Sequence, residues 1–487
     1  MKSKITLLLL VLGSFFSNAQ TICTAGFAGV YPCNKIDLLS RLTLTQLNGN
    51  VPTTAEGNDI WGWTDPLNGK EYAIVGLTTH TAFVDITVPT VPVYLGKLLS
   101  ASTSQPNNTW RDVKVYNNHA FIVSEAREHG MQVFDLKRLR GIVSPQTFTA
   151  DANYIGFGRC HNIAIDEVNG FAYAIGTRTY VPGGSGVSNG GGPHIINIQN
   201  PTSPTFVNEY NAQGYSHDAQ IVVYNGPDTE HLGKQIYIGS NGNKVVVVDI
   251  TNKVTPILLS TFTYTNSDYT HQGWFTENHK YFVLGDETDE QTYGFNTKTI
   301  VVDMTNLDAP VLKFNYSGPT AAIDHNGYTK GNEFYLANYR AGFRLIDISD
   351  LDNSNMTEMG FFDTYPSSNA NQFNGAWSVY PYFASGSIVI SDIEGGLFVV
   401  KKNAVLSTSD FNTKTVSIYP NPVKDNFTIS MNSNIEKIDI FNVLGEKIKT
   451  FESIVSTNEF SINASGFSSG VYIVIVNNEI SQKLIIE

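Results

Sequence analysis

Four histidines recur at nearly constant spacing through the middle of the 487-residue chain. Successive members lie 56, 54 and 54 residues apart, and they are His161, His217, His271 and His325. Imidazole nitrogens are common ligands of zinc, copper and iron. If the four residues hold equivalent places in a repeated unit, they converge and can form a site for a divalent metal. The alternative is that each imidazole only hydrogen-bonds the backbone of the next unit.

Acidic side chains accompany the histidines, close to them in the chain or in loops expected at the same end of the fold. Their carboxylates would bind Ca²⁺ or orient histidines that bind another metal. Glu287 or Asp324 would then be the general base of a metal-dependent enzyme. A solvated acidic rim is the simpler interpretation. The candidate binding residues at this end of the fold are Asp112, Glu125, Asp218, Asp286, Glu287, Asp324 and Asp392. Arg111 is a nearby cation that would hold an anionic ligand or pair with a carboxylate.

The histidines belong to a longer series of residues that open the same kind of strand. Its members recur every 49 to 56 residues and are Trp61, Trp110, His161, His217, His271, His325 and Trp377. Four short strands in each such unit are typical of β-propeller blades. Residues 40–403 contain seven units of 52 residues. We therefore predict an all-β fold whose main part is a seven-bladed β-propeller over residues 40–403.

The seventh unit stops after three strands, so its fourth strand must come from elsewhere. The segment 38–47, which precedes the first unit, is expected to supply that strand and to close the ring without an exposed sheet edge. Aspartates that end the third strands are interpreted as turn residues and not as a site. They are Asp85, Asp135, Asp249, Asp303 and Asp347.

The first 19 residues have the features of a secretory signal peptide. Lys2 and Lys4 precede an apolar stretch over 5–16, and Ser-Asn-Ala at 17–19 forms the small-residue cleavage site. The apolar stretch is too short for a transmembrane helix and no second one follows, so we predict no transmembrane segment. In the segment 20–39, Cys23 and Cys33 form a disulfide or remain two free thiols, and an oxidising compartment favours the disulfide. Cys160 is expected to be a buried free thiol.

The C-terminal part of the chain is a separate unit. Residues 404–415 are rich in Ser, Thr and Asn and are expected to be a linker. Residues 416–487 contain short alternating strands and predict a small β-sandwich. The net charge of −13 over the whole chain argues against nucleic acid as a partner, because phosphate binding needs clustered Lys and Arg.

The C-terminal unit resembles the sorting domain of Bacteroidetes type IX secretion substrates. The residues that carry the resemblance are Tyr-Pro-Asn-Pro at 419–422, Phe-Asn-Val-Leu-Gly at 441–445, Gly-Val-Tyr at 470–472 and Lys-Leu-Ile-Ile at 483–486. The resemblance implies Sec export to the periplasm and then passage through the outer membrane by the type IX machinery. It also implies removal of this unit, with release of the protein or its attachment to the surface.

Residues from about 25 to 400 resemble the choice-of-anchor B family, whose propeller blades carry the LVIVD repeat. Matching stretches are Asn-Asp-Ile-Trp-Gly-Trp at 58–63, Trp-Arg-Asp-Val-Lys-Val at 110–115, His-Asp-Ala-Gln at 217–220, Thr-His-Gln-Gly-Trp at 270–274 and Asp-His-Asn at 324–326. This resemblance implies an architecture without implying a reaction.

Two kinds of function remain open from the sequence. We favour a secreted or outer-membrane-surface binding protein, whose Tyr-, Asn- and Gly-rich mouth loops engage a glycan or a peptide. The alternative is a metal-dependent hydrolase or oxidoreductase that uses the histidines with a divalent ion such as Ca²⁺, Zn²⁺, iron or copper.

Overall fold

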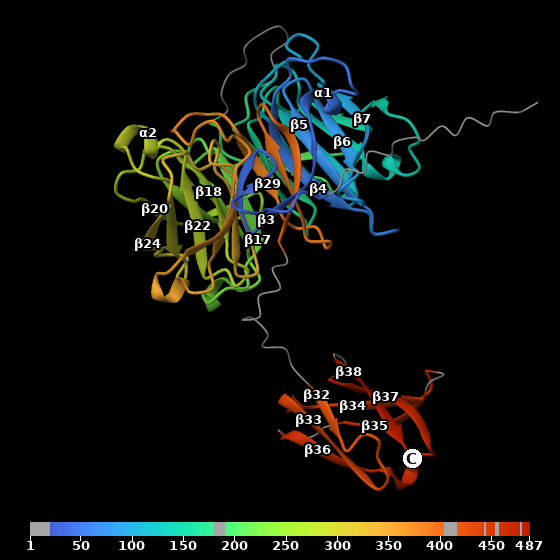
Figure 1. The fold of residues 1–487 in the computed structure, drawn as a ribbon. Helices are drawn as coiled ribbons and strands as arrows, with labels where there is room; N and C mark the ends of the chain where they lie inside the picture. Colours follow the sequence, from blue (N-terminus) through green and yellow to red (C-terminus); the bar gives the residue numbers. More distant parts are fainter. Residues whose placement is uncertain (1–19, 180–189, 404–415, 443–444, 453–456, 478–479) are drawn as a thin grey trace, which may run out of the picture. The chain divides into compact units, whose positions relative to one another are not determined.

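The computed structural model describes residues 20–179, 190–403 and 416–487, apart from 443–444, 453–456 and 478–479. The chain divides into two compact units, Met1–Ala404 and Val405–Glu487. Figure 1 shows both units built mainly of strands. The predicted signal peptide at 1–19 and the predicted linker at 404–415 lie outside the described residues. No helix of the described residues is long and apolar enough to cross a membrane.

The described part of the first unit contains seven sheets whose strands are mainly antiparallel. The strands of each sheet are given from the innermost outward. The first sheet has β4 (Gly57–Thr64), β5 (Glu71–Leu77), β6 (His80–Asp85), β7 (Val93–Leu99) and β11 (Gln146–Phe148), and the second has β8 (Arg111–Tyr116), β9 (His119–Ser124), β10 (Met131–Asp135) and β12 (Ala152–Tyr154). The third sheet has β13 (Asn162–Asp166), β14 (Phe171–Ile175), β15 (His194–Asn197) and β16 (Thr205–Glu209), and the fourth has β17 (Asp218–Val223), β18 (Gln235–Ser240), β19 (Val245–Asp249) and β20 (Ile257–Phe262).

The other three sheets follow in chain order. The fifth sheet has β21 (Thr270–Phe275), β22 (Tyr281–Asp286), β23 (Lys298–Asp303) and β24 (Val311–Ser317). The sixth has β25 (Gly327–Lys330), β26 (Glu333–Ala337), β27 (Phe343–Asp347), β28 (Thr357–Phe362), β2 (Tyr31–Asn34) and β1 (Phe27–Ala28). The seventh has β29 (Ala376–Tyr380), β30 (Ser387–Asp392), β31 (Gly396–Lys402) and β3 (Ile36–Leu42). Short helices in the connections are α1 (Leu44–Leu47), η1 (Leu136–Leu139), η2 (Thr229–His231), α2 (Asp289–Tyr293) and η3 (Leu351–Asn353).

The innermost strands form a closed ring. Each contacts the innermost strand of the next sheet, and β29 contacts β4 to complete the circle. Figure 1 shows the orange β29 next to the blue β4. The prediction of an all-β propeller is confirmed.

Burial explains why the strands carry the residues they do. β19 reads Val-Val-Val-Val-Asp, and its four valines are buried because sheets cover both of its faces. The outer strand β20 keeps Ile257 and Leu258 exposed. The aspartates at the ends of third strands are turn residues, as predicted: their Oδ1 atoms accept hydrogen bonds from the backbone amide two residues later. The five are Asp85, Asp135, Asp249, Asp303 and Asp347.

The N-terminal segment closes the last sheet, with different bounds from those predicted. β3 pairs antiparallel with β31 from Ile36 to Leu42, so the strand prediction for 38–47 is right for its first half only. Leu44–Leu47 is instead a helical turn, because the Thr43 hydroxyl and the Gln46 side chain cap each other's backbone amides.

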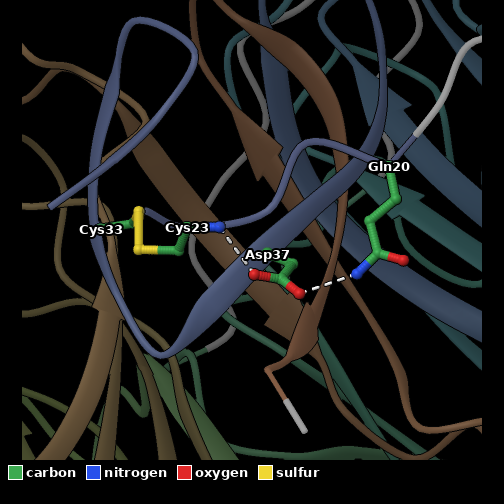
Figure 2. The surroundings of a disulfide bond; sticks show 4 residues. All are labelled: Gln20, Cys23, Cys33 and Asp37. Atoms are coloured by element: carbon green, nitrogen blue, oxygen red, sulfur yellow. Dashed lines mark hydrogen bonds between the residues drawn. A yellow bond between two sulfur atoms is a disulfide. The ribbon is translucent and has the colours of Figure 1, made fainter. Parts of the chain in front are cut away.

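A disulfide joins Cys23 to Cys33, which confirms the predicted pairing. Figure 2 shows Asp37 beside it: one carboxylate oxygen accepts from the Cys23 amide at 2.8 Å and the other from the Gln20 side chain at 2.7 Å. β2, which contains Cys33, adds to the sheet of β28. Cys160 is fully buried and free, as expected.

The second unit is a small β-sandwich, as predicted. One sheet has the order β32 (Val416–Tyr419), β33 (Asn426–Ile435) and β36 (Thr457–Asn463). The other has the order β35 (Lys447–Phe451), β34 (Ile438–Asn442), β37 (Gly470–Val476) and β38 (Ile480–Ile486), and η4 (Ala464–Gly466) is a connection. Both sheets contribute to one apolar core that includes Phe427, Ile440 and Val474.

Candidate functional site

The four histidines lie at the same end of the ring of inner strands. His161 and His217 directly precede β13 and β17, His271 is the second residue of β21, and His325 lies two residues before β25. Centroid distances between neighbouring imidazoles are 4.1 Å for His161 and His217, 4.3 Å for His217 and His271, and 4.5 Å for His271 and His325. The regular spacing therefore does bring the four rings together. We call this end of the channel the histidine end.

Backbone carbonyls of the next sheet hold two of these rings. His217 Nδ1 donates to the carbonyl of His271 at 3.3 Å, and His325 Nδ1 donates to the carbonyl of Trp377. His161 differs, because its Nδ1 pairs with the Glu125 carboxylate at 2.7 Å. A bond from Nδ1 to backbone leaves Nε2 with its lone pair. The backbone role and the metal role are therefore compatible for the same imidazole.

The buried imidazoles are neutral at neutral pH. Burial lowers the pKa of His217 and of His271 well below the ordinary value, and neighbouring histidines add to the effect. Burial also lowers the pKa of His325 to about 3. A neutral imidazole is the form that binds metals.

A carboxylate from the loop after β22 reaches two of the histidines. Glu287 Oε2 lies 3.6 Å from His271 Nε2, and Glu287 Oε1 lies 3.5 Å from His325 Nε2. The hydroxyl of Tyr339 donates to Glu287 Oε1 at 2.8 Å. Burial raises the pKa of Glu287 to about 7. Three donor atoms, one from each of Glu287, His271 and His325, lie within 4.8 Å of one another.

This group differs from the predicted set of four histidines. Consecutive inner strands stand side by side around a ring, so their first residues form an arc and do not surround one point. Within the described residues, the donor group at this end includes His271 and His325 but neither His161 nor His217. The carboxylate partner comes from a loop, where no periodic spacing marks it.

Asp112 and Asp218 hold the inner strands together below the histidines. Asp112 accepts from Lys114 Nζ at 2.7 Å with one oxygen and from the Ile163 amide at 2.8 Å with the other. Asp218 accepts from the Asn162 side chain at 2.9 Å, and burial raises its pKa to about 7. All of these contacts are internal to the ring of strands, so both aspartates have a structural role here.

Arg111 is buried, and among the described residues no carboxylate forms an ion pair with it. Its Nε donates to the Leu77 carbonyl at 3.0 Å, and its Nη1 contacts His129 Nε2 at 3.1 Å. The alternative of an ion pair with a neighbouring carboxylate is therefore wrong. Burial lowers the pKa of Arg111 to about 10, which still leaves it positively charged at neutral pH.

The remaining acidic candidates have different surroundings. Asp286 accepts from the Tyr264 hydroxyl at 2.7 Å and from two backbone amides, so it organises its loop. Asp392 accepts from the amides that follow it, and burial raises its pKa to about 6. Asp324 is buried, and its carboxylate oxygens have no hydrogen bond from the described residues. Burial, with a smaller effect of the neighbouring Glu290, raises the pKa of Asp324 well above the ordinary value.

The opposite end of the channel holds a cavity of about 600 Å³. All seven inner strands, or the residues that follow them, contribute to its lining. The aromatic cavity, as we call it, is lined by Trp61, Trp274, Tyr380 and Tyr382 together with Glu167, Gln220, Glu277, His279 and Thr329. The sequence predictions missed this site. The feature of the sequence that could have predicted it is the set of aromatic residues at those ends of the inner strands that lie away from the histidines.

Trp61 is not equivalent to the histidines, contrary to the repeat assignment. It lies in the middle of β4, which begins at Gly57 and has a register shift between Gly57 and Ile60. Trp61 is the fifth residue of β4, whereas the histidines lie at or near the starts of their strands, so Trp61 lies further toward the other end of the channel. There it lines the aromatic cavity.

Two protein families match parts of the chain. Residues 417–487 match the secretion system C-terminal sorting domain, and residues 232–264 and 329–364 match the LVIVD repeat. The chain carries LVIVD repeats and a type IX sorting domain. Each LVIVD match covers three consecutive strands of one sheet, β18 to β20 and β26 to β28. The sorting domain marks the chain for export by type IX secretion, to the cell surface or the medium.

Individual proteins resemble the chain either over a short stretch or with low sequence identity. The ulvan lyase NLR42 of Nonlabens ulvanivorans is 41% identical over 93 residues, which cover 18% of this chain and 17% of that enzyme. A structure of PorZ, a type-IX secretion component of Porphyromonas gingivalis, is 14% identical with a TM-score of 0.42, covering 86% of this chain and 58% of PorZ. A protein from Lactobacillus plantarum is 11% identical with a TM-score of 0.42, covering 84% of this chain and 98% of that protein. These likenesses carry no functional conclusion.

Proposed function

We propose that the exported propeller is a binding protein that takes an uncharged oligosaccharide into the aromatic cavity. The observation that carries the proposal is the cavity itself: about 600 Å³, on the channel axis, with aromatic and polar side chains converging on it. Ligand pockets commonly have volumes of about 300–1,000 Å³ and combine apolar walls with a few placed polar groups. This role differs from the mouth loops favoured by the sequence, but it keeps the class of ligand.

The aromatic walls are held rigidly by one another. The Trp61 ring packs against Tyr380 at 5.1 Å and 66°, and Tyr380 packs against Tyr382 at 5.3 Å and 77°. Trp274 packs edge-on against the buried Tyr328 at 4.9 Å. Edge-to-face contacts of this kind are stabilising, and they fix ring orientation. Trp274 and Tyr382 are only half-buried, so their surfaces are available for the apolar C–H face of a sugar ring.

Polar groups around the rings are suited to sugar hydroxyls. Gln220 uses its Oε1 to accept from the Phe275 amide at 2.8 Å, which leaves its NH₂ group to donate to a ligand. Glu277 accepts from the Gly331 amide with Oε1 and keeps Oε2 for a hydroxyl donor. Glu167, directly after β13, is an exposed carboxylate of the same lining. A polyol can therefore be both a donor and an acceptor here.

The charge of the lining disfavours anionic ligands. Glu167 and Glu277 are the ionisable side chains of the described lining, apart from His279, whose pKa burial lowers to about 4. Lys114 lies 4.7 Å from the Trp61 ring, but Asp112 and Asp59 neutralise it. An acidic polysaccharide would meet two carboxylates and no Lys or Arg of the described lining, so an uncharged one fits better.

The test is calorimetric titration of the full chain with neutral trisaccharides of glucose, xylose, mannose and N-acetylglucosamine. We expect at least one of them to bind, and Trp274→Ala to weaken that binding at least tenfold, or about 1.4 kcal/mol. Trp110→Ala is the matched control. Trp110 is 43% exposed and directly precedes β8 at the histidine end, away from the aromatic cavity. This variant should leave the affinity unchanged.

Two comparison ligands make the result decisive. Choline tests whether the aromatic groups and the carboxylates select a cation, and trigalacturonate tests an anionic sugar. Tighter binding of either one than of every neutral trisaccharide would overturn the proposal. So would the absence of neutral trisaccharide binding at millimolar concentration.

A further inference from the structure

We infer that His271, His325 and Glu287 form a three-ligand site for a divalent transition metal such as Zn²⁺ at the histidine end. The inference goes beyond the proposed function, because it concerns the opposite end of the channel and different residues. Two imidazoles and one carboxylate are a donor set found in zinc proteins, with the fourth position left to water or another ligand.

The separations between the donor atoms suit one ion. Glu287 oxygens lie 3.6 Å from His271 Nε2 and 3.5 Å from His325 Nε2. Bonds of 2.0–2.1 Å in a tetrahedral arrangement place neighbouring ligand atoms about 3.4 Å apart. A direct hydrogen bond between the same atoms would be shorter, about 2.7–2.9 Å. The observed distances are thus closer to ligands around an ion than to an ion pair.

The buried imidazole of His271 has unmet bonding capacity. It is 2% exposed, and its Nδ1 makes no full hydrogen bond with the described residues, although the His325 backbone lies close to the ring. Its Nε2 is 3.6 Å from the nearest carboxylate oxygen of Glu287, beyond hydrogen-bond distance. A buried polar atom without a partner destabilises the fold. A metal ion between Nε2 and Glu287 would give Nε2 the partner that it lacks.

The other two donors are already oriented as metal ligands usually are. The Trp377 carbonyl accepts from His325 Nδ1, which directs the Nε2 lone pair toward Glu287. The Tyr339 hydroxyl donates to Glu287 and holds its carboxylate in place. Hydrogen bonds of this kind fix the tautomer and the orientation of the residues that bind a metal, and their loss commonly weakens metal binding 10–100-fold.

The room at this end favours an ion over a substrate. A cavity of about 30 Å³ is lined by His217, His271 and His325 together with residues of the neighbouring strands. A water molecule needs roughly 10–15 Å³ by a comparable measure. The lining includes both histidine donors but not Glu287, and the cavity is too small for a sugar or a peptide.

The experiment is a zinc titration of the full chain after chelator treatment, followed by elemental analysis of the dialysed protein. We expect one Zn²⁺ per chain, and loss of that ion in His325→Ala and in Glu287→Gln. The Glu287→Gln variant is nearly isosteric, so it keeps the test valid if the histidine variant does not fold. Co²⁺ in place of Zn²⁺ should give visible absorption of a tetrahedral site in the wild type and not in these variants.

Two control variants define the site. His217→Gln alters one of the four clustered histidines that lies outside the donor group. Asp308→Asn alters the other group of three donors among the described residues, which consists of Asp228, His231 and Asp308. Both should keep the bound ion. No bound zinc in the wild type, or loss of zinc in either control equal to that in His325→Ala, would overturn the inference.

Discussion

The closing strand β3 permits a quantitative prediction about what holds the ring together. Leu39 lies in β3 and is 5% exposed, in the same core cluster as Leu397 and Val399 of β31. Truncating a buried leucine to alanine costs about 2–5 kcal/mol, the sum of lost burial and the cavity left behind. We therefore expect Leu39→Ala to lower the free energy of unfolding of the propeller by about 2–5 kcal/mol.

The matched control is another leucine on an outer strand. Leu99 in β7 is 49% exposed, so Leu99→Ala should change the stability by no more than about 0.5 kcal/mol. Urea unfolding followed by near-ultraviolet circular dichroism measures both variants. Deleting residues 20–42 is the stronger form of the experiment. It removes Ile36, Leu39 and Leu42 together, each worth about 1.5–3 kcal/mol of burial, against a total stability of about 5–15 kcal/mol.

The truncated chain should therefore lose its cooperative unfolding transition. Equal effects of Leu39→Ala and Leu99→Ala, or a cooperative transition of unchanged midpoint in the truncated chain, would refute the reasoning that β3 closes the ring.

Three other predictions follow from the fold. Replacing Cys23 and Cys33 by serine should lower stability by about 2–4 kcal/mol, measured by urea unfolding, because the disulfide restricts the unfolded chain. Burial and Asp289 raise the pKa of Glu290 from 4.5 to about 9. Between these two pH values the Glu290 carboxyl holds its proton in the folded chain and releases it on unfolding. The free energy of unfolding therefore falls as the pH rises, by up to about 1.4 kcal/mol per pH unit for this one carboxyl. Glu290→Gln should flatten this dependence in melts taken from pH 5 to 9, and an unchanged slope would contradict it. The exported protein should begin at Gln20 and lack residues 416–487, and mass spectrometry of cells and medium would detect an intact or retained chain if this is wrong.

The periodic features of the sequence were enough to predict the propeller and the convergence of the histidines. A repeat of constant length fixes which residues start each inner strand, so His161, His217, His271 and His325 fall at one end. The adjacent sorting domain was visible for another reason, because its motifs are specific in themselves.

What the sequence did not predict depends on local departures from the repeat. β4 begins four residues before Trp61, which therefore lies toward the opposite end, and the Thr43–Gln46 cap turns the second half of the predicted closing strand into a helix. Glu287 was one of several acidic residues in its loop, and only the fold places it between His271 and His325. The aromatic cavity combines residues from six inner strands and from the segment after a seventh, a juxtaposition that no single stretch of sequence contains.

Saccharide binding in the aromatic cavity can be located with the five tryptophans as position markers. Trp61, Trp63 and Trp274 line the aromatic cavity, whereas Trp110 and Trp377 lie at the histidine end. In the full chain labelled with 5-fluorotryptophan, fluorine NMR resolves these residues, with assignments from single Trp→Phe variants. Addition of the neutral trisaccharide that binds should shift the signals of Trp61 and Trp274 and leave those of Trp110 and Trp377 in place. A shift confined to Trp110 and Trp377, or no shift at saturating trisaccharide, would contradict the account.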